Sequence, residues 1–190
     1  MAINNIVDES FIINQKKLKQ FGDRCSNVKI GIMGGTFDPI HYAHLATAEF
    51  IRDNYKLDKI LFIPSGNPPH KKGNITDKYD RYNMVLLSTV NNDDFIVSDI
   101  EIKREKSTYT IDTLKVLKQI YKNAEIYFIT GADAICDIET WKDVEGNFKL
   151  ANFIAATRPG ISLLRANEKI KELKDKYNAN IESVYVPSLD

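Results

Sequence analysis

The chain has 190 residues, 43% of them hydrophobic, which suits one globular domain with a buried core. Its 26 basic and 26 acidic side chains balance, which argues against nucleic-acid binding along the whole chain, although a few local donors suffice for a small phosphate ligand. No apolar run is long enough to span a membrane, and the first residues lack the pattern of a secretory signal, so we expect none. With only two cysteines, Cys25 and Cys136, we expect free thiols and a cytoplasmic location.

Residues 1–27 stand apart as an N-terminal extension whose role the sequence does not define. Phe11, Leu18 and Phe21 could share one face of a helix, with lysines around them. This pattern favours a solvated or loosely docked extension over a helix that binds a partner. We expect residues 28–190 to form one domain.

From residue 28 onward, short apolar runs alternate with helix-like stretches. We expect strands over residues 28–33, 59–63, 95–102, 125–130, 152–156 and 181–186, and helices over 41–54, 80–90, 110–122, 132–138 and 161–176. Such alternation is typical of a parallel sheet with helices on both faces, and several runs are continuously apolar, as doubly buried strands are. The sequence therefore predicts an α/β, Rossmann-like, doubly wound fold. In such a sheet, ligands bind beyond the carboxyl ends of the strands, where the strand order reverses.

The segment GGTFDPIHYAH, residues 34–44, directly follows the first predicted strand. Gly34 and Gly35 allow a sharp turn and a close approach of the backbone to a ligand. Thr36 adds a hydroxyl and a backbone N–H group at the same place. Pro39 favours the start of a helix near residues 40–41, and the free N–H groups of a first helical turn attract phosphate.

His41 and His44 are three residues apart on this predicted helix, so their rings lie about 60° apart around its axis and can reach one anion. Two other interpretations remain for the segment. One is a tight turn before a helix whose histidines are satisfied locally. The other is a zinc pair, although the neighbouring sequence offers no cysteine or carboxylate to complete a tetrahedral site.

The segment resembles the GGTFDPxHxGH signature of the nucleotidyltransferase superfamily, which includes nicotinate-mononucleotide adenylyltransferases, pantetheine-phosphate adenylyltransferases and cytidylyltransferases. Ala43 stands where the family usually has Gly. Since alanine is a good helix residue, we expect slight crowding and no loss of function.

This resemblance implies adenylyl transfer. ATP phosphates would lie over the loop and the helix N-terminus, and an acceptor phosphate would attack the α-phosphorus in line and expel pyrophosphate. Mg²⁺ would neutralise the triphosphate, held mainly by the nucleotide and water, so we expect no protein ligands to a metal. The residues assigned to ATP here are Gly34, Gly35, Thr36, Phe37, His41 and His44, with both histidines catalytic.

The polar loop 64–79 is long and rich in Pro, Gly and Asn, and loops of this length are often functional. Its PPHKK stretch, residues 68–72, offers two lysines and a histidine to a phosphate, although a solvated basic loop has the same composition. PPHKK resembles the PPHK segment of the nicotinate-mononucleotide adenylyltransferases. That resemblance assigns Lys71 to substrate phosphates, as a catalytic and mononucleotide-binding residue.

Two further stretches are informative. In STYTIDTL, residues 107–114, Thr110 could cap the following helix. The stretch also resembles the family's SYTIDTL element, which implies that Thr110 lies at a nicotinate pocket. In FITGADAICDIETW, residues 128–141, Asp133 follows a buried strand, where a carboxylate can accept hydrogen bonds from ribose hydroxyls.

The same stretch resembles the family's GAD segment, which implies that Gly131 and Asp133 contact ATP. Trp141, the single tryptophan, is either a core aromatic or, as the resemblance implies, the side chain that stacks on the nicotinate ring. Arg158 follows the fifth predicted strand and is either a clamp on the phosphates of ATP or an exposed loop arginine. Arg81 and Arg104 are most simply interpreted as surface charges.

Together these stretches favour nicotinate mononucleotide as the acceptor, because the pantetheine enzymes have Thr at the position of His41 and lack the PPHK and SYTIDTL elements. The expected products are deamido-NAD and pyrophosphate, in NAD biosynthesis. Two alternatives remain open. Nicotinamide mononucleotide differs from the favoured acceptor only by an amide in place of a carboxylate. The second alternative is a non-catalytic nucleotide-binding module, since the family's second signature, ISSTxIR, does not occur before Asp190.

Overall fold

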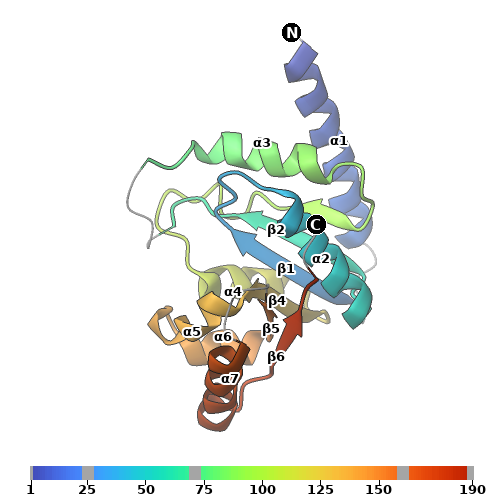
Figure 1. The fold of residues 1–190 in the computed structure, drawn as a ribbon. Helices are drawn as coiled ribbons and strands as arrows, with labels where there is room; N and C mark the ends of the chain where they lie inside the picture. Colours follow the sequence, from blue (N-terminus) through green and yellow to red (C-terminus); the bar gives the residue numbers. More distant parts are fainter. Residues whose placement is uncertain (1, 23–27, 69–73, 158–162, 188–190) are drawn as a thin grey trace.

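A computed structural model of the chain describes residues 2–22, 28–68, 74–157 and 163–187. Its centre is a six-stranded sheet of order β3-β2-β1-β4-β5-β6, in which neighbouring strands are parallel (Figure 1). The strands are β1 (Lys29–Gly35), β2 (Lys59–Pro64), β3 (Phe95–Val97), β4 (Glu125–Gly131), β5 (Asn152–Thr157) and β6 (Ile181–Tyr185). The predicted α/β doubly wound fold is confirmed.

The helices are α1 (Ala2–Gly22), α2 (Tyr42–Tyr55), α3 (Lys78–Thr89), α4 (Thr110–Ile120), α5 (Ala132–Cys136), α6 (Val144–Leu150) and α7 (Leu163–Tyr177), with a 3-10 turn at Ile138–Thr140. Successive residues of a strand point to opposite faces of the sheet, and an apolar layer covers each face. Ile30 and Ile32 of β1 pack with α4, α5, α6 and α7, whereas Met33 packs with α2 and α3. No helix within the described ranges is long and apolar enough to cross a lipid bilayer.

The sheet reverses its order at β1, because β2 and β3 follow on one side and β4, β5 and β6 on the other. Parallel strands place all their carboxyl ends along one edge of the sheet. The segment 34–44 leaves β1 at this edge, so the structure puts it where ligands of doubly wound sheets bind.

Two predicted elements are shorter than expected, and one observed helix was not predicted. The strand expected at 95–102 ends at Val97, because the chain then turns, with Lys103 N–H bonded to the Asp99 carbonyl. The helix expected at 132–138 ends at Cys136 and is followed by the separate 3-10 turn. Helix α6 was not expected, since its seven residues include a glycine.

Helix α1 packs along the outer edge of β3, with its N-terminal end projecting beyond α3 (Figure 1). The Asn14 side chain is buried and bonds Val97 twice, accepting from its N–H and donating to its carbonyl, at 2.8 and 2.9 Å. Leu18 and Phe21 reach the core, but Phe11 is 42% exposed because it lies to one side of the buried face. Helix α1 is therefore packed against the sheet edge through buried side chains.

Candidate active site

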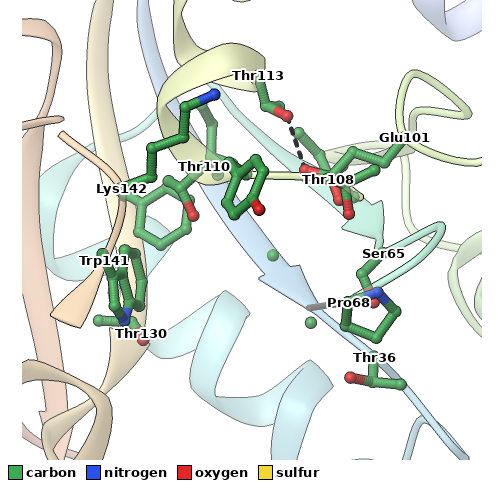
Figure 2. A pocket seen from close by; sticks show the side chains of 16 residues that line it. Thr36, Ser65, Pro68, Glu101, Thr108, Thr110, Thr113, Thr130, Trp141 and Lys142 are labelled. Carbon is green, nitrogen blue, oxygen red and sulfur yellow. Dashed lines mark hydrogen bonds between the residues drawn. The ribbon is translucent and has the colours of Figure 1, made fainter. Parts of the chain in front are cut away.

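A pocket opens at the carboxyl edge of the sheet, between β1, β2 and β4 (Figure 2). Its walls come from the end of β1, the loop after β2, the segment that leads into α4, the end of β4 and the turn before α6. The lining residues are Ile32, Gly34, Gly35, Thr36, Ile63, Ser65, Pro68, Glu101, Thr108, Tyr109, Thr110, Thr113, Phe128, Thr130, Trp141 and Lys142. Five residues that the sequence indicated, Gly34, Gly35, Thr36, Thr110 and Trp141, thus meet at one cavity.

The loop after β1 turns on a residue with a left-handed backbone. Phe37 has φ of 50°, and its ring is buried against Phe62 at a centroid distance of 6.1 Å. A Cβ on Gly35 would come within 3.1 Å of the Phe37 ring, so the position is tight for any larger residue. Phe37 therefore supports the loop from behind and does not line the pocket.

The two histidines stand at the start of α2, at the other end of this loop. Their rings stack with centroids 3.8 Å apart and planes inclined by 30°. His41 is the N-cap residue, and its backbone N–H donates to Nδ1 of His44 at 3.3 Å, which leaves Nε2 as the protonated nitrogen of a neutral His44. Phe37 packs edge-on against His44 at 5.1 Å. Neither histidine lines the pocket, but both flank the loop that does.

A buried arginine ties the loops around the pocket together. Arg81 is 1% exposed and donates to three carbonyls: that of Thr36 at 2.6 Å, that of Gly66 at 3.1 Å and that of Thr76 at 2.9 Å. The expectation of a surface charge at Arg81 is therefore wrong. Sequence alone gave no sign of this role, because two of the three acceptors, the carbonyls of Thr36 and Gly66, are backbone groups distant from Arg81 along the chain.

On the opposite wall, helix α4 begins at Thr110 with Tyr109 as its N-cap residue, so Thr110 is not the cap. Thr113, one turn into the helix, donates its hydroxyl proton to Oε1 of Glu101 at 2.7 Å and accepts a hydrogen bond from Arg104 at 3.0 Å. Arg104 is thus part of this wall and is not a simple surface charge. Glu101 is only 9% exposed, and burial raises the pKa of its carboxyl.

Trp141 combines the two roles considered for it. It packs edge-on against Phe128 at 6.0 Å, as part of the core boundary, and it also lines the pocket (Figure 2). The neighbouring Lys142 lines the pocket as well. Its ammonium group donates to Asp112 at 2.9 Å and lies 4.6 Å from the centre of the Tyr109 ring. Glu101 and Lys142 were missed from sequence, although Lys142 could have been noted beside Trp141.

Gly131 and Asp133 lie at the same edge of the sheet but outside the pocket lining. Gly131 ends β4 and is the N-cap residue of α5, and Asp133 is exposed in the first turn of that helix. Thr130, just before them, does line the pocket. Lys71 and Arg158, the other two assigned residues, lie outside the described residues, as does Cys25.

No protein-held metal site is evident in the described part of the chain, where no three His, Cys, Asp or Glu side chains gather closely enough to hold an ion. The His44 ring accepts a hydrogen bond from the His41 backbone N–H and the two rings stack, with no third ligand beside them among those residues. A zinc pair at residues 41 and 44 therefore has no support from the geometry.

Comparison with known proteins gives a consistent result. The cytidylyltransferase-like family matches residues 32–186. A protein of Thermoanaerobacter sp., named "Probable nicotinate-nucleotide adenylyltransferase", is 54% identical over 164 residues, which cover 85% of this chain and 78% of that protein. A protein of the same name from Clostridium tetani is 42% identical over 163 residues, covering 85% and 82%.

Solved structures agree on the fold. The nicotinic acid mononucleotide adenylyltransferase of Plasmodium falciparum, complexed with NaAD, matches with a TM-score of 0.72 and 27% identity, covering 86% of this chain and 78% of that one. A structure from Vibrio parahaemolyticus shares the fold with a TM-score of 0.57 and 21% identity, over 78% of this chain and 88% of that one. On the family match and these identities, the chain belongs to the cytidylyltransferase-like family and, within it, to the nicotinate-nucleotide adenylyltransferases.

Proposed function

We propose that this chain transfers the adenylyl group of ATP to nicotinate mononucleotide, giving deamido-NAD and pyrophosphate in NAD biosynthesis. The family membership supports the reaction. The single observation that carries the site is the pocket itself, which brings the two glycines at the end of β1 together with Trp141 at the reversal point of the sheet. The structural relative from Plasmodium falciparum is complexed with NaAD, which suits a pocket of this kind.

The nicotinate ring would stack on Trp141, whose flat face borders the pocket, with Thr110 beside it. The mononucleotide phosphate would then point towards Gly34, Gly35 and Thr36. With no Cβ, the two glycines let the phosphate approach the backbone closely, and Lys71 would neutralise part of its charge.

ATP would bind across the same loop and the first turn of α2. There His41 and His44 would donate to phosphate oxygens, and the positive end of the helix would stabilise the anion. Gly131 and Asp133 would contact the nucleoside part, and Arg158 would bind phosphate. The acceptor phosphate attacks the α-phosphorus in line and pyrophosphate leaves, so the site acts by positioning and by stabilising charge.

Magnesium would enter as part of MgATP, coordinated mainly by the triphosphate and water. The described residues offer an exposed carboxylate, Asp133, near the loop but no carboxylate cluster that would hold the ion without the nucleotide. The ion would neutralise the triphosphate, and the residues named above would perform the positioning.

The function is tested by pyrophosphate release from MgATP with nicotinate mononucleotide, nicotinamide mononucleotide and phosphopantetheine supplied in parallel. Release with the nicotinate compound well above the other two is expected. Preference for nicotinamide mononucleotide would change the acceptor but keep the reaction. No release from any acceptor, by a folded protein that binds ATP, would identify a non-catalytic nucleotide-binding module.

A further inference from the structure

The pocket contains a buried carboxyl group that the proposed mechanism does not use. Glu101 lines the cavity and is only 9% exposed, in a segment that looked like a strand in the sequence. Removing a carboxylate from water is costly unless hydrogen-bond donors replace the lost water. The hydrogen-bond donors around Glu101 therefore show whether the protein alone satisfies the carboxyl or leaves room for a donor from a ligand.

The protein supplies only part of what this carboxyl can accept. A carboxylate offers about four acceptor positions. The Thr113 hydroxyl occupies one, on Oε1 at 2.7 Å, and is itself polarised by the Arg104 guanidinium at 3.0 Å. The Thr108 side chain lies next to the carboxyl (Figure 2). Even with both threonines counted, acceptor positions remain on the Glu101 carboxyl, and the residue lines the cavity.

Other polar atoms at the same place lack partners. The Ser65 hydroxyl oxygen is buried and lines the pocket, and it has no hydrogen-bond partner within the described ranges. Figure 2 shows Ser65, Thr108 and Glu101 together on one side of the cavity, with Trp141 and Thr130 on the other. Buried polar groups are normally paired, so a site with an unpaired hydroxyl and spare acceptors fits a ligand that brings both donors and acceptors.

A sugar with free hydroxyls has this chemistry. The flat aromatic ring of a pyridine mononucleotide instead suits the side of the pocket that Trp141 and Phe128 form. We propose that Glu101 is a mononucleotide-binding residue, whose carboxyl accepts a hydrogen bond from a ribose hydroxyl of the acceptor. The assignment rests on the proposed function, since it takes the acceptor to be a pyridine mononucleotide. The pocket would then have two ends, an aromatic end that binds the pyridine ring and a carboxyl end that binds the ribose.

The test combines one substitution with substrates that lack single hydroxyls. Binding of nicotinate mononucleotide and of its 2′-deoxy and 3′-deoxy analogues is measured by calorimetry, for the full chain and for Glu101→Gln, which keeps the size of the side chain. The substitution should weaken binding of the natural compound by about tenfold to a hundredfold, the usual range for a hydrogen bond to a charged group. For the deoxy analogue that lacks the hydroxyl bound by Glu101, the unchanged chain and Glu101→Gln should bind with the same affinity.

Two controls accompany it. Glu105→Gln makes the same chemical change at an exposed position of the same segment and should leave binding unchanged. ATP binding should be the same in all variants. Equal weakening of the ribose compound and both analogues would show that Glu101 only holds the wall through Thr113, and would overturn the proposal.

The outcome remains decisive if Glu101→Gln fails to fold. Glu101→Asp then replaces it, and the unchanged chain must bind at least one deoxy analogue about tenfold more weakly than the ribose compound. Equal binding of all three by the unchanged chain would refute the assignment. Failure of the proposed function is distinguishable, because the unchanged chain would then neither bind nicotinate mononucleotide nor release pyrophosphate.

Discussion

At the scale of single residues, the stacked histidines at the start of α2 carry the clearest prediction. His44 accepts the His41 backbone N–H through Nδ1, so its other nitrogen can donate to a phosphate oxygen. We expect His44→Ala to lower kcat for pyrophosphate release by about a hundredfold or more, because a donor to developing charge is lost. The thermal midpoint should change little, since the side chain is only partly buried.

Asn54→Ala, an exposed position at the far end of the same helix, is the matched control and should keep full turnover. A well-folded His44→Ala variant with normal kcat would remove the histidine from the mechanism.

Replacing Trp141 should change KM, whereas replacing His44 should change kcat, because a side chain that stacks on the substrate acts in substrate binding. Trp141→Ala should raise KM for the mononucleotide about tenfold and leave KM for ATP nearly unchanged, since the ring loses its stacking partner. Trp141→Phe should recover much of the loss. Steady-state kinetics with each substrate varied in turn would decide, and an equal rise in both KM values would point to its packing against Phe128 instead.

The residues that the sequence identified are those that belong to continuous motifs. Gly34 lies in the last two residues of β1 and Thr36 follows the strand directly, so a local pattern was sufficient to place them at the sheet edge. Arg81 and Glu101 act through partners distant in sequence: Thr36 and Gly66 for the arginine, Thr113 for the glutamate. Side chains satisfied by distant backbone or hydroxyl groups leave no periodic or local pattern, so sequence reasoning missed both.

At the scale of elements, the N-terminal helix is where the sequence was least informative. A helix was suggested by its apolar spacing, but the structure adds a polar contact, between the Asn14 side chain and the backbone of Val97 on the edge strand. Covering a sheet edge in this way satisfies backbone groups that would otherwise be available to another strand. Only the tertiary structure shows which residue does so.

The Asn14 contact predicts a large effect on stability. Asn14→Ala leaves a buried N–H and a buried carbonyl of Val97 without partners, so we expect the free energy of unfolding to fall by about 2–4 kcal/mol. Urea unfolding followed by circular dichroism measures this change. Gln15→Ala, exposed on the same helix, should have almost no effect. A loss below about 0.5 kcal/mol for Asn14→Ala would mean that the two Asn14 hydrogen bonds contribute little to the stability of the fold.

At the scale of the whole molecule, the alternation of strands and helices was sufficient to predict the parallel sheet and the edge where ligands bind. It was not sufficient to set the strand order, which depends on which apolar faces fit together. The reversal at β1 explains why residues 34–36, 110 and 141, far apart in the chain, line one pocket. The two charged residues that line the pocket, Glu101 and Lys142, became visible only once these segments were assembled.

The stability of the whole domain should also depend on pH through one carboxylate that joins its C-terminal elements. Glu139, in the 3-10 turn after α5, accepts hydrogen bonds from Lys169, Lys176 and Tyr177 of α7. The Lys169 ammonium, followed by the other two donors, lowers the pKa of Glu139 to about 2. The Glu139 carboxyl therefore binds a proton less tightly in the folded protein than in the unfolded chain, where a glutamate has a pKa of about 4.3.

A pKa lowered by folding stabilises the protein above the unfolded value, and this stabilisation is lost as the pH falls from about 4 towards about 2. We expect Glu139→Gln to lower the urea midpoint at pH 7, and the difference from the unchanged chain to shrink progressively below about pH 4. Glu168→Gln, exposed on α7, serves as the control and should follow the unchanged chain throughout. If the gap at pH 2.5 were as wide as that at pH 7, the ionised form of Glu139 would not be what holds α7 to the turn.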